Sequence, residues 1–137
     1  MITTPALLAQ EDVFAKAFAA GDLSIARDLY RPDVVYLSPT VRLFAWPHRI
    51  EGVAKTLEFI ALTIRGCRDI AYRVVETAIT PAGDAAFVRL HFDWTTADER
   101  RLRSSYVVIY RYRDGRISRQ ELYYDPTGAL EELARSS

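Results

Sequence analysis

The apolar residues of this chain follow a helical period in its first half and a strand alternation in its second half, with the change near Gly66. Between residues 53 and 64 they recur at spacings of three and four, which is the period of one helix face. Within residues 85–96 apolar and polar side chains alternate, as in a half-buried strand. Helices that precede the strands, rather than alternating with them, predict an α+β domain with an antiparallel sheet.

Three helices are predicted in the first half of the chain. The first starts at Thr4, an N-cap residue followed by proline, and ends at Gly21. A second, short helix is predicted within residues 22–32, between a capping aspartate and a proline that stops it. The third occupies residues 52–66 and carries a continuous apolar stripe. These helices would cover one face of the sheet.

The strands follow from residue type and turn signals. A short strand is predicted at residues 33–38, and residues 39–48, bracketed by prolines, form an irregular segment that could cover a pocket. The Asp114-Gly115 pair predicts a type I′ hairpin turn. Four long strands are predicted at Ile70–Thr80, Ala85–Thr96, Leu102–Tyr112 and Ile117–Tyr124. A short helix over Thr127–Ala134 closes the chain, and one domain over residues 1–137 is expected.

Charge and cysteine content narrow the function classes. The chain carries 18 basic and 18 acidic residues, which offers no field for nucleic acid or an anionic membrane. Cys67 is the single cysteine and there are two histidines, so neither an internal disulfide nor a zinc site at structural spacing is expected. The sequence has no signal-like leader and no apolar run of roughly 18 residues. We therefore expect a cytoplasmic protein.

Several short segments resemble the SnoaL-like branch of the nuclear transport factor 2-like superfamily. They are Ala20-Gly21-Asp22, Ile50-Glu51-Gly52, YRYRDGRI at residues 110–117, and Tyr123-Tyr124-Asp125-Pro126. The resemblance covers nearly the whole chain. It implies a cone-shaped α+β fold, in which three N-terminal helices pack on a curved antiparallel sheet and leave a cavity for a small molecule. Relatives include isomerases, polyketide cyclases, epoxide hydrolases and plain binding modules, so the fold does not define the function.

The resemblance excludes one mechanism of this superfamily. Ketosteroid isomerases use a carboxylate base opposite a tyrosine and a protonated aspartate. The tyrosine position of the first helix falls at Phe14 here. The base falls near Leu37 and Ser38, and the second aspartate falls at Val107 or Val108. Isomerisation by that set of residues is therefore not expected.

Asp125 is the first candidate for acid/base chemistry. SnoaL-like cyclases place an aspartate at the end of the last strand, and Asp125 occupies that place. A carboxylate at the mouth of an apolar pocket can move a proton next to a carbonyl group. Asp125 also directly precedes Pro126 and a short predicted helix, so it is equally suited to cap that helix through the N–H of Thr127 or Gly128.

A second candidate set lies on the strand within residues 85–96. Arg89, His91 and Asp93 alternate with apolar residues, so the three polar groups share one face and could form a proton-transfer set. The alternative is a sheet face turned to water. The superfamily register implies that Phe87 and Arg89 point toward the cavity.

The resemblance also implies which residues line the cavity. On the last strand Gln120, Leu122 and Tyr124 share a face, and Tyr124 could donate a hydrogen bond to a substrate oxygen or simply pack. Phe14, Phe18 and Leu57 would complete the wall from the helices.

Two function hypotheses follow. The first is an enzyme of SnoaL-like type that uses neither metal nor cofactor and performs isomerase, cyclase or hydrolase chemistry on an apolar, oxygenated compound. The second is a binding or interaction module of the same fold. A homodimer is expected in either case, because Tyr110, Tyr112, Phe92 and Trp94 cannot all fit inside one subunit, so one sheet face would need a partner.

Overall fold

A computed structural model of the chain describes residues 1–125. The helices are α1 (Thr4–Ala20), the 3₁₀-helix η1 (Leu23–Leu29), α2 (Val41–Phe44) and α3 (Val53–Ile64). The strands are β1 (Tyr30–Leu37), β2 (Ile50–Glu51), β3 (Arg68–Ile79), β4 (Ala85–Thr95), β5 (Arg101–Arg113) and β6 (Arg116–Tyr124). The predicted α+β class, with helices followed by a curved sheet, is confirmed. The predicted helix over Thr127–Ala134 lies outside the described residues.

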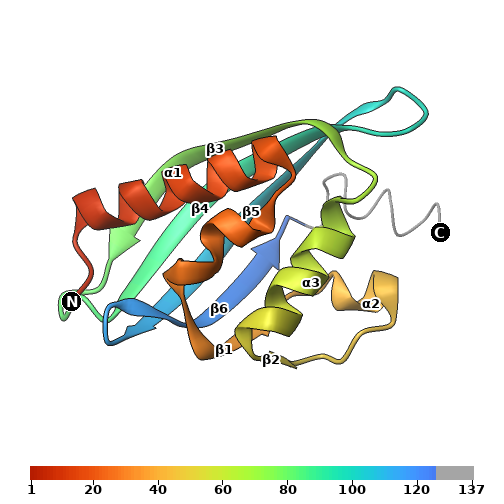
Figure 1. The fold of residues 1–137 in the computed structure, drawn as a ribbon. Helices are drawn as coiled ribbons and strands as arrows, with labels where there is room; N and C mark the ends of the chain where they lie inside the picture. Colours follow the sequence, from red (N-terminus) through yellow and green to blue (C-terminus); the bar gives the residue numbers. More distant parts are fainter. Residues whose placement is uncertain (126–137) are drawn as a thin grey trace.

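The strands form one open six-stranded sheet in the order β2-β1-β6-β5-β4-β3. β3 to β6 form an antiparallel meander, whereas β1 pairs with β6 in parallel. Figure 1 shows α1 and α3 on the same face of this sheet, with η1 between them. We call that face the inner face and the opposite one the outer face. In the described part of the chain, no helix is both long and apolar enough to cross a membrane.

The predicted ends of the first helix are correct to within one residue. Its N-cap is Thr3, whose hydroxyl accepts the N–H of Ala6, and not Thr4. Gly21 ends the helix with φ of 67°, and its N–H donates to the carbonyl groups of Ala17 and Phe18. That left-handed conformation favours glycine, as the sequence predicted.

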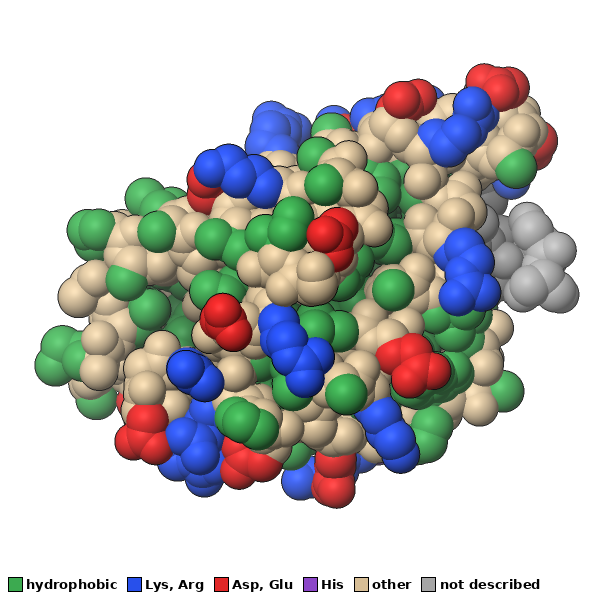
Figure 2. All heavy atoms as spheres, viewed as in Figure 1, with side chains coloured by type: hydrophobic (Ala, Val, Ile, Leu, Met, Phe, Trp, Pro, Cys, Tyr) green, Lys and Arg blue, Asp and Glu red, His purple; other side chains and the backbone are tan. Residues whose placement is uncertain are grey.

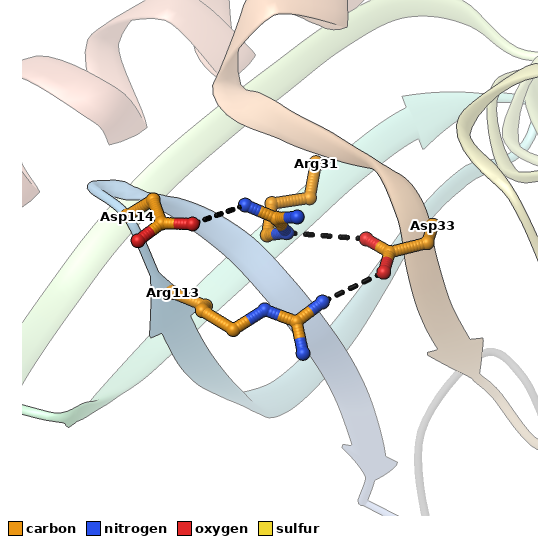
Figure 3. A network of polar contacts seen from close by, with 4 residues as sticks. All are labelled: Arg31, Asp33, Arg113 and Asp114. Carbon is orange, nitrogen blue, oxygen red and sulfur yellow. Dashed lines mark hydrogen bonds and ion pairs between the residues drawn. The ribbon is translucent and has the colours of Figure 1, made fainter.

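β1 begins three residues before the predicted strand and passes through Pro32. Proline cannot donate to a ladder, and the β1–β6 register shifts between Tyr30 and Val35, where Pro32 lies. Figure 3 shows how charges attach this irregular segment to the β5–β6 hairpin. Arg31 bridges Asp33 and Asp114 at 3.1 and 2.7 Å, and Arg113 reaches Asp33 at 2.6 Å. These exposed pairs contribute little stability individually, but they align β1 with the hairpin.

The inner face holds more aromatic residues than the sequence predicted. Tyr110, Phe92 and Trp94 are buried on it, and the half-buried Tyr112 lies on the same side of β5. The expectation that these four could not all fit inside is therefore wrong. The curved sheet and the helices leave a space between them that aromatic rings line rather than fill.

Candidate functional site

A cavity lies between the inner sheet face and the helices, with a volume of about 130 Å³. This is close to the ~150 Å³ of an apolar cavity that admits benzene, so it has room for a compound of about one ring. Phe14 and Phe18 of α1 contribute to one wall, Ile60 and Ile64 of α3 to another, and Trp94 of β4 to the sheet side. Figure 2 shows side chains of both charge signs intermixed over the face that carries the helices.

The irregular segment 39–48 contributes to the cavity, as the sequence allowed. It contains the short helix α2, and Thr40, Leu43 and Phe44 line the cavity. Phe44 is 37% exposed and makes an edge-to-face contact with Phe59 of α3, at 6.0 Å between ring centroids. The segment therefore covers one side of the site.

Tyrosine is the main polar residue of the cavity wall. Of the eight tyrosines in the chain, five line the cavity, namely Tyr36, Tyr72, Tyr106, Tyr110 and Tyr124. Burial raises the pKa of each above its ordinary value, to about 12 for Tyr124. At neutral pH these tyrosines are neutral phenols, and each hydroxyl can donate one hydrogen bond and also accept one.

Glu11 is a buried carboxyl group directly behind two of these tyrosines. It lies on α1 and is 2% exposed. Tyr72 donates to its Oε1 at 2.6 Å, and Tyr110 donates to its Oε2 at 3.0 Å. The side-chain amide of Gln10 donates to Oε2 at 3.1 Å, and Gln10 in turn accepts from Tyr112 at 2.8 Å. Burial raises the pKa of Glu11 above its ordinary value, although the three hydrogen bonds oppose that rise.

The remaining tyrosines differ in their hydrogen bonding. Tyr30, behind the wall, donates to the Oε1 of Gln120 at 2.6 Å. The hydrogen bonds of Tyr124 to Ser38 and Thr40 oppose the effect of burial on its pKa. Tyr106 is 8% exposed, and its hydroxyl makes no hydrogen bond within residues 1–125; its oxygen must be open to solvent, because no fully enclosed side-chain oxygen or nitrogen in that range lacks a partner. Its hydroxyl is therefore available to a ligand.

Most residues that the resemblance implied for the wall lie there. Phe14, Phe18, Gln120, Leu122 and Tyr124 all line the cavity. Leu57 does not line the cavity, although it is buried in the core on the same helix as Ile60, which does. Their role in substrate binding stays a prediction.

The predicted proton-transfer set lies on the outer face. Arg89 pairs with Glu76 of β3 at 2.8 Å, and the Nδ1 of His91 lies 3.2 Å from the Oγ of Ser105. Two hydrogen bonds from Arg103, at 2.7 and 3.0 Å, hold the pKa of Asp93 below its ordinary value. None of the three lines the cavity.

The implied register of β4 is therefore wrong. The residues of β4 that face the helices are Val88, Leu90, Phe92 and Trp94, and not Phe87 and Arg89. The unbroken pairing of β4 with β5 fixes this parity over the whole strand, because side chains alternate with a period of two.

Asp125 lies just after β6 and is exposed. Its N–H donates to the carbonyl of Ser105 at 2.8 Å, which continues the sheet by one residue. It is not part of the cavity wall. Its predicted capping partners, Thr127 and Gly128, lie outside the described residues, so both roles of Asp125 stay predictions.

Cys67 also lines the cavity, where burial raises the pKa of its thiol to about 11. The thiol is therefore protonated at neutral pH and a poor nucleophile. Among residues 1–125, no three His, Cys, Asp or Glu side chains gather in an arrangement that could hold a metal ion.

Glu11 was not predicted from the sequence, although a signal for it was present. Leu7, Glu11, Phe14 and Phe18 follow one another at spacings of four, three and four, which puts the carboxyl group on the apolar stripe of the helix. A glutamate at such a position is buried when the helix packs.

The sequence matches the profile of the SnoaL-like domain over residues 11–120. Among solved structures, TsrD from Streptomyces laurentii is 17% identical, with a TM-score of 0.78 and coverage of 97% of this chain and 98% of that one. TerC, co-crystallised with polyporic acid, is 19% identical, with a TM-score of 0.76 and coverage of 93% and 97%. A protein of ketosteroid isomerase-like fold from Catenulispora acidiphila, in complex with trimethylamine, is 15% identical, with a TM-score of 0.74 and coverage of 96% and 95%. A comparison with curated protein sequences found no match.

Proposed function

The chain belongs to the family of SnoaL-like domains, and we propose that its cavity binds a small, mainly apolar compound of about one ring that carries an oxygen atom. The observation that carries this proposal is the composition of the cavity wall. Aromatic and aliphatic side chains form most of it, and the polar groups among them are uncharged: tyrosine, threonine and serine hydroxyls, the thiol of Cys67 and the amide of Gln120. Such a wall favours an apolar body with one or two hydrogen-bonding atoms.

The Tyr106 hydroxyl supports the oxygen atom in this proposal. A tyrosine hydroxyl that makes no hydrogen bond within the described residues can donate one to a ligand or to water. A carbonyl, hydroxyl or ether oxygen of the ligand can accept its hydrogen bond. TerC, a protein of similar fold, was co-crystallised with polyporic acid, and an acid of this kind carries oxygen atoms as the proposed ligand does.

Tryptophan emission tests the proposal. The chain has two tryptophans, and Trp94 lines the cavity whereas Trp46 does not. In the Trp46→Phe protein all tryptophan emission comes from Trp94. We expect cyclohexanone or 4-methylphenol to change that emission with a saturable dependence on concentration and to raise the melting temperature. If a panel of single-ring ketones and phenols changes neither, the cavity is not a ligand site of this class.

General acid/base chemistry is the second candidate function, and the cluster of Glu11 with Tyr72 and Tyr110 favours it. A carboxyl group whose pKa is raised is a stronger base than an ordinary carboxylate and is therefore suited to accept and return a proton. We expect the protein to speed exchange of the α-hydrogens of cyclohexanone in D2O, followed by proton NMR. If the exchange rate is equal with and without the protein, the acid/base proposal is wrong and only the ligand-binding proposal stands.

We also propose that the protein forms a homodimer through the outer face of the sheet. Phe87, Val107 and Ile109 are only partly buried there, and Tyr123 is 56% exposed. The same face carries charges of both signs, so a second copy can complement it. We expect light scattering to give twice the subunit mass of 15.6 kDa, and Ile109→Arg to give the subunit mass. A wild-type mass of one subunit at tens of micromolar would refute the dimer.

A further inference from the structure

Glu11 lacks the partner that a buried carboxylate ordinarily has. No lysine, arginine or histidine of residues 1–125 lies within ion-pair distance of it, and none influences its ionisation. The titratable groups around it are all phenols: Tyr72 from β3, Tyr106 and Tyr110 from β5, Tyr112 beyond Gln10, and Tyr30 from β1. A negative charge on Glu11 is therefore held by hydrogen bonds alone and has no neutralising cation.

The same carboxyl group acts on the cavity in two ways. The side chains of Tyr72 and Tyr110 line the cavity and also donate hydrogen bonds to Glu11, so they connect the carboxyl group to the cavity. The field of Glu11 reaches Tyr106 as well, because its charge adds to the rise that burial causes in the pKa of Tyr106. A charge that opposes ionisation of this phenol opposes any other anion at the same place.

From these contacts we propose that Glu11 is a proton-exchanging group of the cavity and that its preferred ligands are weak acids with a hydroxyl group, namely phenols or enols. In a cavity whose Glu11 is ionised, one negative charge can lie either on Glu11 or on the ligand. When the ligand hydroxyl gives its proton to the oxygen of Tyr72, the proton that Tyr72 held passes to Glu11. One O–H bond breaks at the ligand and one forms on the carboxyl group, and Tyr72 is unchanged.

This inference rests on the proposed ligand cavity and adds a thermodynamic consequence. Where the ligand binds as an anion, the site must take up one proton. The dissociation constant then changes by up to about tenfold per pH unit relative to a site without this group, because each linked proton contributes one such factor. A purely structural Glu11 would not alter the pH dependence of binding.

The test uses 4-nitrophenol, which ionises, and 4-nitroanisole, which has the same ring and nitro group but no acidic hydrogen. Dissociation constants are measured by calorimetry between pH 5 and 9 for the wild-type protein and for Glu11→Gln. Glutamine keeps the size of the side chain and one of its two acceptor oxygens but cannot take up the proton. We expect the wild-type profile for 4-nitrophenol to contain one more linked proton than the Glu11→Gln profile, whereas 4-nitroanisole binds both proteins without pH dependence.

Tyr112→Phe is the matched control. It also removes a tyrosine hydroxyl that bonds to α1, but that hydroxyl contacts Gln10 and its side chain does not line the cavity. We expect its 4-nitrophenol profile to equal that of the wild type. We expect Tyr72→Phe, which removes the hydroxyl between the ligand and Glu11, to reduce the extra proton linkage.

Each outcome decides between the two proposals. If both probes bind and the wild-type and Glu11→Gln profiles coincide, this inference is overturned and the cavity proposal stands. If neither probe binds the wild-type protein, both are overturned. Should Glu11→Gln fail to fold, the carboxyl carbon of Glu11 in ¹³C-labelled wild-type protein reports its protonation directly by NMR. An unchanged titration of that carbon when 4-nitrophenol binds also overturns the inference.

Discussion

Charged groups have different partners on the two faces of β4. On the outer face, Arg89 and Asp93 are charged, partly exposed and paired with Glu76 and Arg103 of the neighbouring strands. On the inner face the strand is apolar, and the nearby carboxyl group of Glu11 is enclosed by phenols and an amide. Among residues 1–125, the charges of Arg89 and Asp93 on the outer face are paired with opposite charges, whereas Glu11 beside the cavity has no cation as a partner.

This difference distinguishes the exposed ion pairs of the outer face from the buried carboxyl group of Glu11, which is the candidate for a functional role. Exposed ion pairs contribute about 0–1 kcal/mol each because water screens them, so the outer charges mainly keep the sheet register. A buried carboxyl group without a cation lowers stability in its ionised form, and its presence next to a ligand cavity favours a chemical role. Substitutions on the two faces should therefore differ in the size of their effects.

The largest effect is expected from the inner face of β4. Leu90 is fully buried, and Leu90→Ala removes its packing and leaves a cavity. We expect a loss of about 2–5 kcal/mol in the free energy of unfolding, measured by urea denaturation. A loss below about 1 kcal/mol would show that the inner face is loosely packed.

A smaller loss is expected from Tyr110→Phe. Tyr110 is 1% exposed, and its hydroxyl donates to Glu11. Removal of that donor leaves the carboxyl group with fewer hydrogen bonds, at a cost of about 1–3 kcal/mol. The same urea experiment measures it. Stability equal to the wild type would mean that Glu11 does not need this bond.

The pH dependence of stability should change in Glu11→Gln. The pKa of Glu11 is raised in the folded state from 4.5, so the folded protein binds more protons than the unfolded chain as the pH rises above 4.5. Wild-type stability therefore declines between pH 4.5 and the folded pKa, and glutamine removes that decline. Thermal denaturation from pH 4 to 8 should show Glu11→Gln gaining on the wild type as the pH rises. A constant difference would contradict a raised pKa.

The smallest effect is expected on the outer face. Arg89→Ala breaks the pair with Glu76, whose two side chains are 57% and 68% exposed. We expect the free energy of unfolding to change by less than about 1 kcal/mol in urea denaturation. Leu90→Ala, the adjacent residue on the opposite face, is the comparison. A loss as large as that of Leu90→Ala would remove the distinction between the faces.

Sequence patterns predicted the elements well because those depend on local chemistry. The helix end at Gly21 and the hairpin at Asp114-Gly115 need positive φ, and both occur where glycine and aspartate predicted them. The parity of β4 was not predictable in the same way, since both of its faces carry large side chains and one shift of register exchanges them. Helix, turn and strand signals are local, whereas register depends on the partner strand.

The candidate site was predicted only in part for a related reason. Gln120, Leu122 and Tyr124 lie on the wall as implied, because the side chains of β6 alternate between the two faces from Gln120 onward. Glu11 meets Tyr72 and Tyr110 across 61 and 99 residues of sequence, and no local pattern relates them. The sequence around Tyr106 likewise does not show that its hydroxyl makes no hydrogen bond within the described residues, because that depends on side chains from other elements. Side chains that converge from distant elements need the folded chain to be recognised.

Two adjacent serines of β5 allow the most direct test of the ligand cavity. Ser104 lines the cavity, whereas Ser105 faces outward and bonds to His91. Ser104→Phe adds a ring to the cavity, and Ser105→Phe adds the same ring to the opposite face. In calorimetric titrations with 4-methylphenol, we expect Ser104→Phe to weaken binding by more than about tenfold, or ~1.4 kcal/mol, and Ser105→Phe to match the wild type. Equal affinity in all three proteins would contradict a ligand site in this cavity.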